Sequence, residues 1–379
     1  MIRLPITRLR DGMVTAQSIY NSEGASYLTR GTKLNQQYID RLRKIGISSV
    51  TITSLDPDLP LPPPEDIIQE DTRVTAIHQV YDTYARIQQA KDMEIPPLLS
   101  ASESIIADLI QKPDNLVQMT DIRLYDDYTF AHSVNVAALS AMLGLLCHFS
   151  KSALITLTMG ALLHDIGKLK VNLKILNKPG ALTDEEFKTI HLHPEWGWQR
   201  LRELTCTDLD VSAIANIAYQ HHEHLDGSGY PRHLTDDSIS DFSKIVAIAD
   251  VYDALTTQRP YKKAYPPHIA YKIMTKCSGK QFDPPLLKLF FDHVALYPIG
   301  TVLKTAMGYG IVKDVHIGMT RYPRLILFAD NSNQLLPTPI TIETTDHDSD
   351  FITSVVDGND FGALCFRLKF NPASLLMQE

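Results

Sequence analysis

The sequence predicts a multidomain protein with a central all-α domain, a small α+β module before it and a small β-rich domain after it. Apolar residues recur at helical spacing from about residue 97 to residue 296, which is typical of a helical domain with a large core. Beyond residue 296 the pattern changes to short β-type runs separated by glycines. Five prolines between residues 57 and 64 indicate an extended, semi-rigid linker that sets the first module apart.

Composition and charge limit the classes of partner. The chain has 379 residues, of which 44% are hydrophobic and 21% are charged, an ordinary composition for a soluble protein. The formal net charge of −8 argues against a nucleic-acid polymer as the main partner, because no basic excess offsets phosphate repulsion. A small anionic ligand could still bind where a few lysines and arginines come together.

Cysteine usage and hydropathy predict a cytoplasmic protein without a membrane span. The four cysteines are far apart and form no C-x-x-C pair, so neither a disulfide framework nor a zinc knuckle is expected. The N-terminus lacks the apolar core of a signal peptide. The apolar segment at 135–149 is shorter than the ~18 residues that a membrane span needs, and we interpret it as a buried helix.

Residues 1–54 are predicted to form the small α+β module. The pattern indicates a strand and turn at 25–34, a helix at 36–45 that ends at Gly46, and a strand at 49–53. No cluster of chemically active groups occurs in this module. We therefore expect it to have an accessory or regulatory role.

Residues 55–96 are predicted to combine the proline-rich linker with a connector helix. Apolar residues of this helix fall at intervals of seven, three and four positions, a heptad-like stripe: Ile67, Val74, Ile77, Tyr81 and Tyr84. The favoured interpretation is a helix packed on its own domain. The alternative is a connector that forms a homodimer and carries signals between domains, and the charge pattern does not decide between them.

The central domain at 97–296 and the C-terminal domain at 297–379 differ in their apolar patterns. Helical apolar runs occupy 98–110, 130–146, 153–163, 214–219, 245–255 and 268–274. After them, short β-type runs at 302–315 and 325–328 alternate with glycines. This last region is predicted to be a small β domain or barrel with an accessory role.

Histidines and aspartates interrupt the apolar helices of the central domain. The candidate metal ligands are His132, His164, Asp165, His193, His221, His222 and Asp250. A set of nitrogen and oxygen ligands without a thiolate suits a hard or borderline metal pair better than a structural zinc ion. Taken alone, His132 would be better explained as a core histidine, and Asp250 as a carboxylate at the start of a helix at 250–257.

The order and spelling of three motifs carry a family resemblance. The motifs are His164-Asp165-Ile166-Gly167-Lys168, then His221-His222-Glu223-x-x-Asp226-Gly227-x-Gly229-Tyr230-Pro231, then Ala249-Asp250-Val251-Tyr252-Asp253-Ala254-Leu255-Thr256 followed by Arg259-Pro260-Tyr261-Lys262. Over 97–294, about half of the chain, the sequence resembles the HD-GYP branch of the HD phosphohydrolases. The resemblance implies that the seven candidates bind two divalent metal ions, with iron or manganese as the expected metals.

The resemblance also implies roles around the metals. Asp165 is expected to bridge two cations, which at a separation of about 3.5–4 Å supply activated water and stabilise charge on a phosphoryl group. Lys168 lies three residues further on, where it could hold a phosphate oxygen or assist the leaving group. Asp253, one turn after Asp250, could orient a ligand or Lys168, and a purely structural role is an alternative.

Substrate contacts are expected from the glycine loop and from two cations. Gly229 and Tyr230 match the loop that contributes to substrate binding in the family. Arg259 and Lys262 would bind the phosphates beyond the reacting one. Histidines that match no motif are expected to be structural or solvent-facing: His78, His148, His191, His268, His293, His316 and His347.

The activity implied by the resemblance is hydrolysis of cyclic di-GMP. Opening one phosphodiester gives linear pGpG, and a second hydrolysis to GMP is an alternative end point. Other open alternatives are a hydrolase of another cyclic or linear dinucleotide, and a non-catalytic cyclic di-GMP receptor, against which the complete ligand set argues. Two metals are expected rather than three, because Tyr128 stands where some family members have a glutamate that helps to hold a third metal.

Overall fold

The structure is a computed structural model, and it describes most of the chain. The described residues are 2–16, 18–20, 26–47, 49–53, 66–112, 117, 128–176, 178, 180–257, 264–345, 350–356 and 358–376. The predicted proline-rich linker at 54–64 lies outside them.

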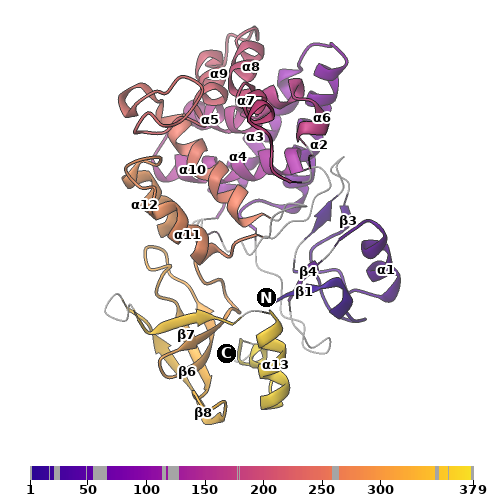
Figure 1. Cartoon of the computed structure of the whole chain (residues 1–379), viewed down its shortest axis with the longest axis vertical. Helices are drawn as coiled ribbons and strands as arrows, with labels where there is room; N and C mark the ends of the chain where they lie inside the picture. The colour runs from indigo at the N-terminus through magenta and orange to yellow at the C-terminus, as the bar shows by residue number, and fades with distance from the viewer. Residues whose placement is uncertain are drawn as a thin grey trace.

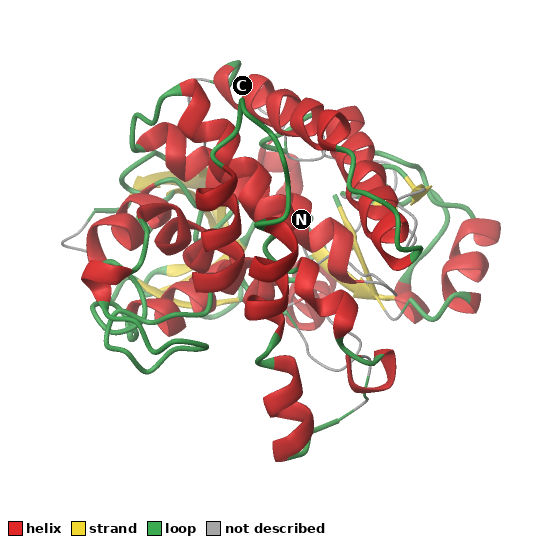
Figure 2. Ribbon diagram, turned by 90° about the horizontal axis from the view of Figure 1, so that it is seen from above, coloured by secondary structure: helices red, strands yellow, loops and turns green. Residues whose placement is uncertain are grey.

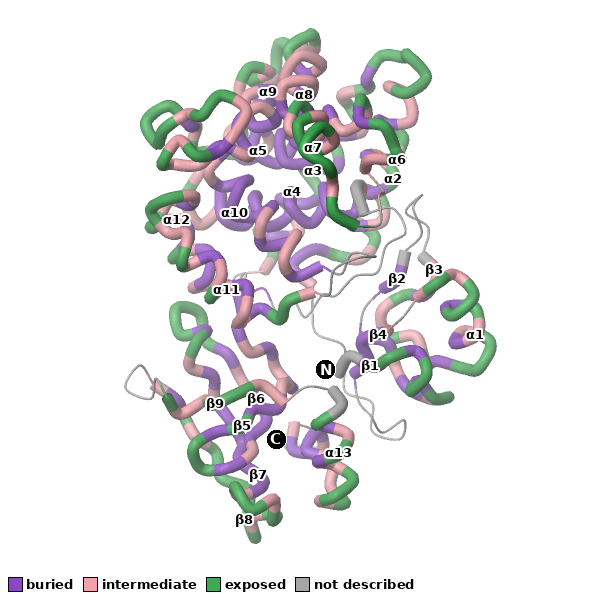
Figure 3. Tube along the Cα trace, in the orientation of Figure 1, coloured by how far each residue is buried: buried purple, intermediate pink, exposed green. Residues whose placement is uncertain are grey.

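Helices dominate the chain between residues 70 and 292, as the sequence predicts, and form the upper part of the molecule in Figure 1. Their bounds are α2 Glu70–Gln88, α3 Ile95–Ile110, α4 Tyr128–Leu146, α5 Lys151–Leu163, η2 Ile166–Lys170, α6 Leu173–Leu176, α7 Asp184–Ile190, α8 His193–Leu201, α9 Val211–Gln220, η3 Asp236–Ser238, α10 Asp241–Thr256, α11 Pro267–Thr275 and α12 Pro284–Asp292. Buried apolar side chains from most of these helices form one continuous core. Figure 3 shows long buried stretches in α4, α5 and α10.

Helix α2 packs on its own domain, which was the favoured interpretation of the apolar stripe. Ile67, Ile77 and Tyr84 are buried in the core of the helical region, and Val74 packs against it. Tyr81 and Tyr84 each make an edge contact with Phe130 of α4, with ring centroids 5.4 and 5.3 Å apart. The stripe is therefore covered within the chain.

Helix packing brings the candidate ligands together. Helix α4 lies between α5 and α10, and α9 packs on both α5 and α8. At the contact between α5 and α9, a Cβ on Gly160 would lie 2.2 Å from the Ile217 side chain, so the glycine allows a close approach. The ends of α5 and α9 and the start of α8 consequently converge on one region.

The predicted position of Asp250 in its helix is wrong. Helix α10 begins at Asp241, with Ser240 as its N-cap, so Asp250 lies in the third turn. The interaction with the helix dipole considered for Asp250 is therefore excluded. Instead, Asp250 and Asp253 are three positions apart on one face of a continuous helix.

The N-terminal region has the predicted α+β character. Its elements are β1 Ile2–Pro5, η1 Ile6–Arg8, β2 Ile19–Tyr20, β3 Ser26–Leu28, α1 Gln36–Lys44 and β4 Ser49–Ile52. Strands β1 and β4 pair in antiparallel register, with Leu4 opposite Val50. Helix α1 ends just before Gly46, whose φ of +84° is the left-handed conformation that favours glycine after a helix.

The C-terminal region is a five-stranded antiparallel sheet with strand order β8-β7-β6-β5-β9. The strands are β5 Val302–Thr305, β6 Gly308–Asp314, β7 Arg324–Ala329, β8 Leu335–Glu343 and β9 Ile352–Val355, followed by α13 Gly358–Leu368 and η5 Pro372–Leu376. In the described residues β8 and β9 are edge strands, so the sheet is open, and the barrel alternative is wrong here.

The two flanking regions share a hydrophobic cluster. Buried side chains from the N-terminal strands and α1 pack together with side chains from the C-terminal sheet, α13 and η5. Seen from above, the helices of the central region lie in front of the strands (Figure 2). In the part of the chain that is described, no helix has the length and apolar character needed to cross a membrane.

Candidate metal centre

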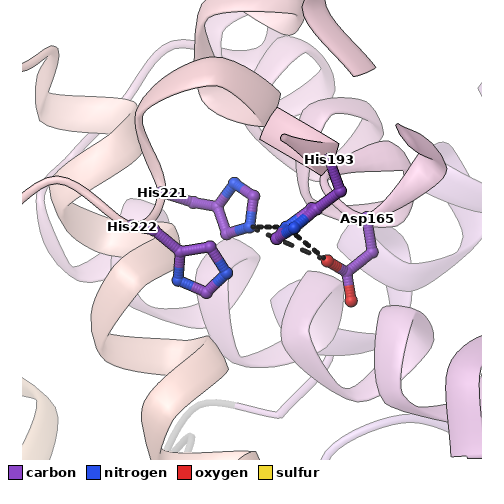
Figure 4. A group of neighbouring side chains, drawn as sticks. All are labelled: Asp165, His193, His221 and His222. Atoms are coloured by element: carbon purple, nitrogen blue, oxygen red, sulfur yellow. Dashed lines mark hydrogen bonds and ion pairs between the residues drawn. The ribbon is translucent and has the colours of Figure 1, made fainter. Parts of the chain in front are cut away.

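The seven predicted ligands lie together in two adjoining groups. One group contains Asp165, His193, His221 and His222, and Figure 4 shows these four side chains converging. The other group contains His132, His164 and Asp250, and within each group the candidate ligand atoms lie within 4.8 Å of one another. Six of the seven residues are buried, and His222 is partly exposed.

Asp165 lies between the two groups and directs one oxygen toward each. Its Oδ1 is 3.3 Å from His193 Nε2 and 3.7 Å from His221 Nε2. Its Oδ2 is 3.4 Å from His164 Nε2 and 3.9 Å from His132 Nε2. This is the arrangement that a carboxylate bridging two cations requires.

Four of the histidines are held in one tautomer by hydrogen bonds from Nδ1. His164 donates to the Ala161 carbonyl at 2.7 Å, and His193 donates to the Ile190 carbonyl at 2.7 Å. His221 donates to the Ala218 carbonyl at 3.0 Å. His132 donates to the Asp253 carboxylate at 2.8 Å. Each Nε2 is therefore the nitrogen that would face a metal, as is usual for histidine ligands.

Two buried polar atoms indicate that these residues fit a metal. His164 Nε2 and Asp165 Oδ1 have no hydrogen-bond partner among the described residues. Leaving such atoms buried and unsatisfied is costly, whereas coordination to a cation would satisfy both. The donors are imidazole nitrogens and carboxylate oxygens without a thiolate, which suits iron or manganese.

Burial keeps three imidazoles neutral. It lowers the pKa of His193 to about 4, despite the opposing effect of Asp165. Burial also lowers the pKa of His221, and it holds the pKa of His222 well below its usual range with help from the neighbouring imidazoles. Neutral imidazoles are the form that binds metals, so these three need lose no proton at neutral pH.

The carboxylates of the centre are ionised, and His132 is basic. Burial alone would raise the pKa of Asp165 and Asp250, but the Lys168 charge beside Asp165 and the His132 hydrogen bond to Asp250 hold both values well below the usual range. Burial lowers the pKa of His132, yet hydrogen bonds to Asp250 and Asp253 outweigh it and raise the value to about 9. The centre thus carries negative charge that favours cations.

Lys168 lies on the same side as Asp165, as the sequence predicts. Its Nζ is 2.5 Å from Asp165 Oδ2, and its side chain is 21% exposed. The segment is the 3₁₀ helix η2 rather than a continuation of α5. A Cβ on Gly167 would lie only 1.9 Å from the His193 carbonyl oxygen, so this glycine lets η2 pack closely on α8.

Glu223 holds the glycine loop, a role that the sequence analysis did not assign. It is buried, and its carboxylate accepts hydrogen bonds from the backbone N–H groups of Arg232 and Leu234 at 2.7 and 2.9 Å. A Cβ on Gly229 would lie 2.3 Å from the His224 backbone nitrogen, so only glycine fits there. Together these contacts fix the loop that carries Tyr230.

Tyr230 lies between two imidazoles at the edge of the centre. Its ring stacks on His222 with centroids 4.7 Å apart, and on His191 with centroids 3.7 Å apart and 7° between the planes. Phe187, which is 52% exposed, contacts His191 at 4.1 Å. Burial raises the pKa of Tyr230, so its phenol is neutral. His191, which the sequence predicts to be structural or solvent-facing, is half-buried and packs on Tyr230.

Replacing His191 with Ala should weaken substrate binding and leave the metals in place, because it frees one face of Tyr230. An aromatic pair is worth about 0.5–1.5 kcal/mol, so KM for the substrate should rise roughly two- to tenfold while kcat changes little. His191→Phe should restore KM by restoring the stack. His268→Ala is the matched control, since His268 stacks on Tyr297 at 5.5 Å and lies in neither metal group. A KM for His191→Ala equal to that of the unmodified protein would contradict this role.

Several sequence-based predictions fall outside the described residues. Arg259 and Lys262 lie in the segment 258–263. The side chain of Tyr128 is also outside the description. Asp253 is described, and it contacts the ligand His132 rather than Lys168 in the recorded hydrogen bonds. Of the two orienting roles considered for Asp253, the hydrogen bond to the candidate ligand His132 fits the first, and that role stays a prediction beside the purely structural one.

The helical fold and the histidine–aspartate centre are those of an HD-type metal-dependent phosphohydrolase, and comparison with known proteins leads to the same class. Residues 103–286 match the family model described as HD domain. The chain is 30% identical over 367 residues to the cyclic di-GMP phosphodiesterase PA4108 of Pseudomonas aeruginosa, covering 89% of this chain and 88% of that protein. This relative and the three motifs described above show that the chain belongs to the HD-GYP branch of the HD-domain family.

Other relatives and one solved structure match smaller parts of the chain. The 3'3'-cGAMP-specific phosphodiesterase 3 of Vibrio cholerae is 39% identical over 171 residues, which are 45% of this chain and 36% of that protein. The cyclic di-GMP phosphodiesterase of Thermotoga maritima is 37% identical over 165 residues, 44% of each chain. Among solved structures, Bd1817 of Bdellovibrio bacteriovorus aligns with a TM-score of 0.45 and 17% identity over 76% of this chain and 97% of that chain.

Proposed function

We propose that this protein is a metal-dependent phosphodiesterase that hydrolyses cyclic di-GMP to linear pGpG, with GMP as an alternative end product. The observation that carries the proposal is the double ligand group around Asp165, with one carboxylate oxygen directed toward each group. The near full-length similarity to a relative named as a cyclic di-GMP phosphodiesterase supports the choice of substrate.

The side chains of the centre suggest how the reaction is supported. The proposed ligands are the seven residues of the two groups, and two bound divalent metals would supply activated water and charge stabilisation. Lys168 is partly exposed beside Asp165, where its ammonium could hold a phosphate oxygen of the substrate. Tyr230 remains neutral and packed on His222, so we propose that it forms a wall of the substrate site.

Anaerobic purification followed by elemental analysis and a product assay tests this proposal. We expect two metals per chain, iron or manganese, and conversion of cyclic di-GMP to pGpG. Three metals per chain would refute the proposed count. Binding of cyclic di-GMP without turnover by the metal-loaded protein would instead favour the receptor alternative.

A second candidate substrate is 3'3'-cGAMP, because a relative named for that substrate is 39% identical over 171 residues. The two cyclic dinucleotides share their phosphodiester chemistry and differ in one base. Comparing kcat/KM for cyclic di-GMP, 3'3'-cGAMP and linear pGpG on one preparation separates these activities. A higher kcat/KM for 3'3'-cGAMP would overturn our choice of substrate.

Replacing Arg259 or Lys262 with Ala should weaken substrate binding by roughly 1–3 kcal/mol, the scale of a charged hydrogen bond. Neither residue is proposed as a metal ligand, so the metal content should equal that of the unmodified protein. Substrate titration and elemental analysis measure the two effects separately. Loss of metal in either variant would show that the proposed division between metal centre and phosphate contacts is wrong.

The roles of the separate parts of the chain are proposed from its domain organisation. We assign catalysis to 97–296, connection to 55–96, and accessory or regulatory roles to 1–54 and 297–379. A cytoplasmic location stays a prediction. A homodimer through α2 would need its polar exposed face, because the apolar stripe is covered within the chain; the exposed positions are Asp71, Thr75, His78 and Asp82.

A further inference from the structure

A ladder of polar side chains joins helices α4 and α10 beneath the metal centre. His132 and Asn135 are three residues apart on α4, and they face Asp250 and Asp253, three residues apart on α10. His132 Nε2 lies 3.0 Å from Asp250, and His132 Nδ1 donates to Asp253 Oδ2 at 2.8 Å. Asn135 Nδ2 donates to Asp253 Oδ1 at 2.7 Å. Both oxygens of Asp253 are therefore engaged.

The ladder continues into helix α2 through Arg73. Its Nη1 donates to Asn135 Oδ1 at 2.6 Å, a contact between residues 62 positions apart in the chain. Its Nε and Nη2 donate to the two carboxylate oxygens of Asp66, at 2.9 and 2.8 Å. Only 1% of the Arg73 side chain is exposed, against 15% for Asp66. The guanidinium is thus clamped in one orientation with three directed hydrogen bonds.

Burying the Arg73 guanidinium costs desolvation free energy, which argues that this residue has a specific role. A buried ion pair seldom stabilises a fold more than apolar side chains of similar volume would. A buried arginine instead constrains how its hydrogen-bond partners are oriented, because the donors of the planar guanidinium have a fixed geometry. Asn135 must present its amide oxygen to Arg73, and so it must present its amide NH₂ to Asp253. The polar contact on α2 therefore fixes the orientation of the Asp253 carboxylate.

We infer that Arg73 is a positioning residue for the metal centre, acting through Asn135 and Asp253 on the ligand His132. Asp253 selects the His132 tautomer whose Nε2 faces Asp250 and His164, and Arg73 holds Asp253 in that position. This inference rests on the proposed metal centre. Its specific consequence is asymmetry, because the hydrogen bonds of the ladder end at the group of His132, His164 and Asp250. Two longer contacts link it to the other group, from Asp250 Oδ2 to His222 Nδ1 at 4.0 Å and from His132 Nε2 to Asp165 Oδ2 at 3.9 Å.

The test is stepwise titration of the metal-free full-length protein with Mn²⁺ by calorimetry. In Arg73→Lys, which keeps the charge and loses the planar guanidinium, one Mn²⁺ should bind several-fold more weakly, a smaller effect than the roughly 10–100-fold loss that follows removal of a direct hydrogen-bond partner of a ligand. The other Mn²⁺ should bind as before. Asn135→Leu, which has the same branched shape without the amide, breaks the ladder at a second point and should have the same effect. The double variant should be no weaker than either single one.

Two controls separate positioning from general stability. Arg86 lies on the same helix as Arg73 and forms an exposed ion pair with Glu94. Arg86→Lys should leave both Mn²⁺ affinities unchanged. Thermal unfolding without metal measures the structural cost of each variant. At saturating Mn²⁺ kcat should equal that of the unmodified protein, and it should fall only at Mn²⁺ concentrations that leave the weaker site unfilled. If Asn135→Leu and Arg73→Lys bind both Mn²⁺ ions like the unmodified protein, or weaken both equally, the inference is overturned. If the unmodified protein fails to bind two Mn²⁺ ions, the proposed centre itself is wrong.

Discussion

Replacing Asp165 with Ala should abolish both metal binding and hydrolysis. One oxygen of this carboxylate faces His193 and His221 and the other faces His164 and His132, so a single substitution removes a ligand from both groups. Losing only an outer partner of a ligand costs 10–100-fold in metal affinity, so the loss here should exceed about a hundredfold for each metal. Elemental analysis and Mn²⁺ titration measure the first effect, and turnover of cyclic di-GMP measures the second.

Asp210→Ala is the matched control for that variant. Asp210 caps helix α9, which ends at the ligand His221, and accepts a hydrogen bond from the Ala213 N–H at 2.9 Å. Its loss should cost about 0.5–2 kcal/mol of stability and no metal. If Asp165→Ala keeps two metals per chain, Asp165 does not bridge them, and the two groups must bind their cations independently.

The helical fold was predictable because its signals are local. Apolar spacing located α4, α5 and α9, and His193-Pro194 marked the start of α8, where proline is tolerated in the first turn. The start of α10 was missed although a signal was present. The Ser240 side chain accepts a hydrogen bond from the Ser243 N–H at 3.1 Å and so caps the helix. A serine just before an apolar run is a sequence signal for such an N-cap.

The candidate ligands were predictable from motifs, whereas their supporting residues were not. Arg73 and Asn135 are 62 positions apart, and Asn135 and Asp253 are 118 positions apart, so only the packing of α2, α4 and α10 brings them together. His191 lies two residues before the candidate ligand His193, yet its stacking contact with Tyr230 forms only because the glycine loop places Tyr230 over it. Burial also changes what these groups do, since it lowers the pKa of His193 and keeps the imidazole neutral.

Gly167→Ala should disturb both stability and metal binding, because the added methyl group has no space. Its Cβ would lie 1.9 Å from the His193 carbonyl oxygen and 2.6 Å from the Gly197 backbone nitrogen, so backbone must move rather than a flexible side chain. Overpacking of this kind costs about 1–3 kcal/mol. Moving η2 away from α8 also separates Asp165 and Lys168 from His193, so Mn²⁺ affinity at that group should fall as well.

Gly362→Ala separates this local effect from the general effect of adding a methyl group to a helix. Gly362 lies in α13, and a Cβ there would meet no atom within 4 Å. Alanine should be neutral or stabilise that helix by up to about 1 kcal/mol, with Mn²⁺ binding unchanged. If Gly167→Ala loses thermal stability but keeps both Mn²⁺ affinities, η2 and α8 can separate without moving the ligands. Close packing at Gly167 would then serve the fold alone, and the geometry of the metal centre would be set by α4, α5, α9 and α10.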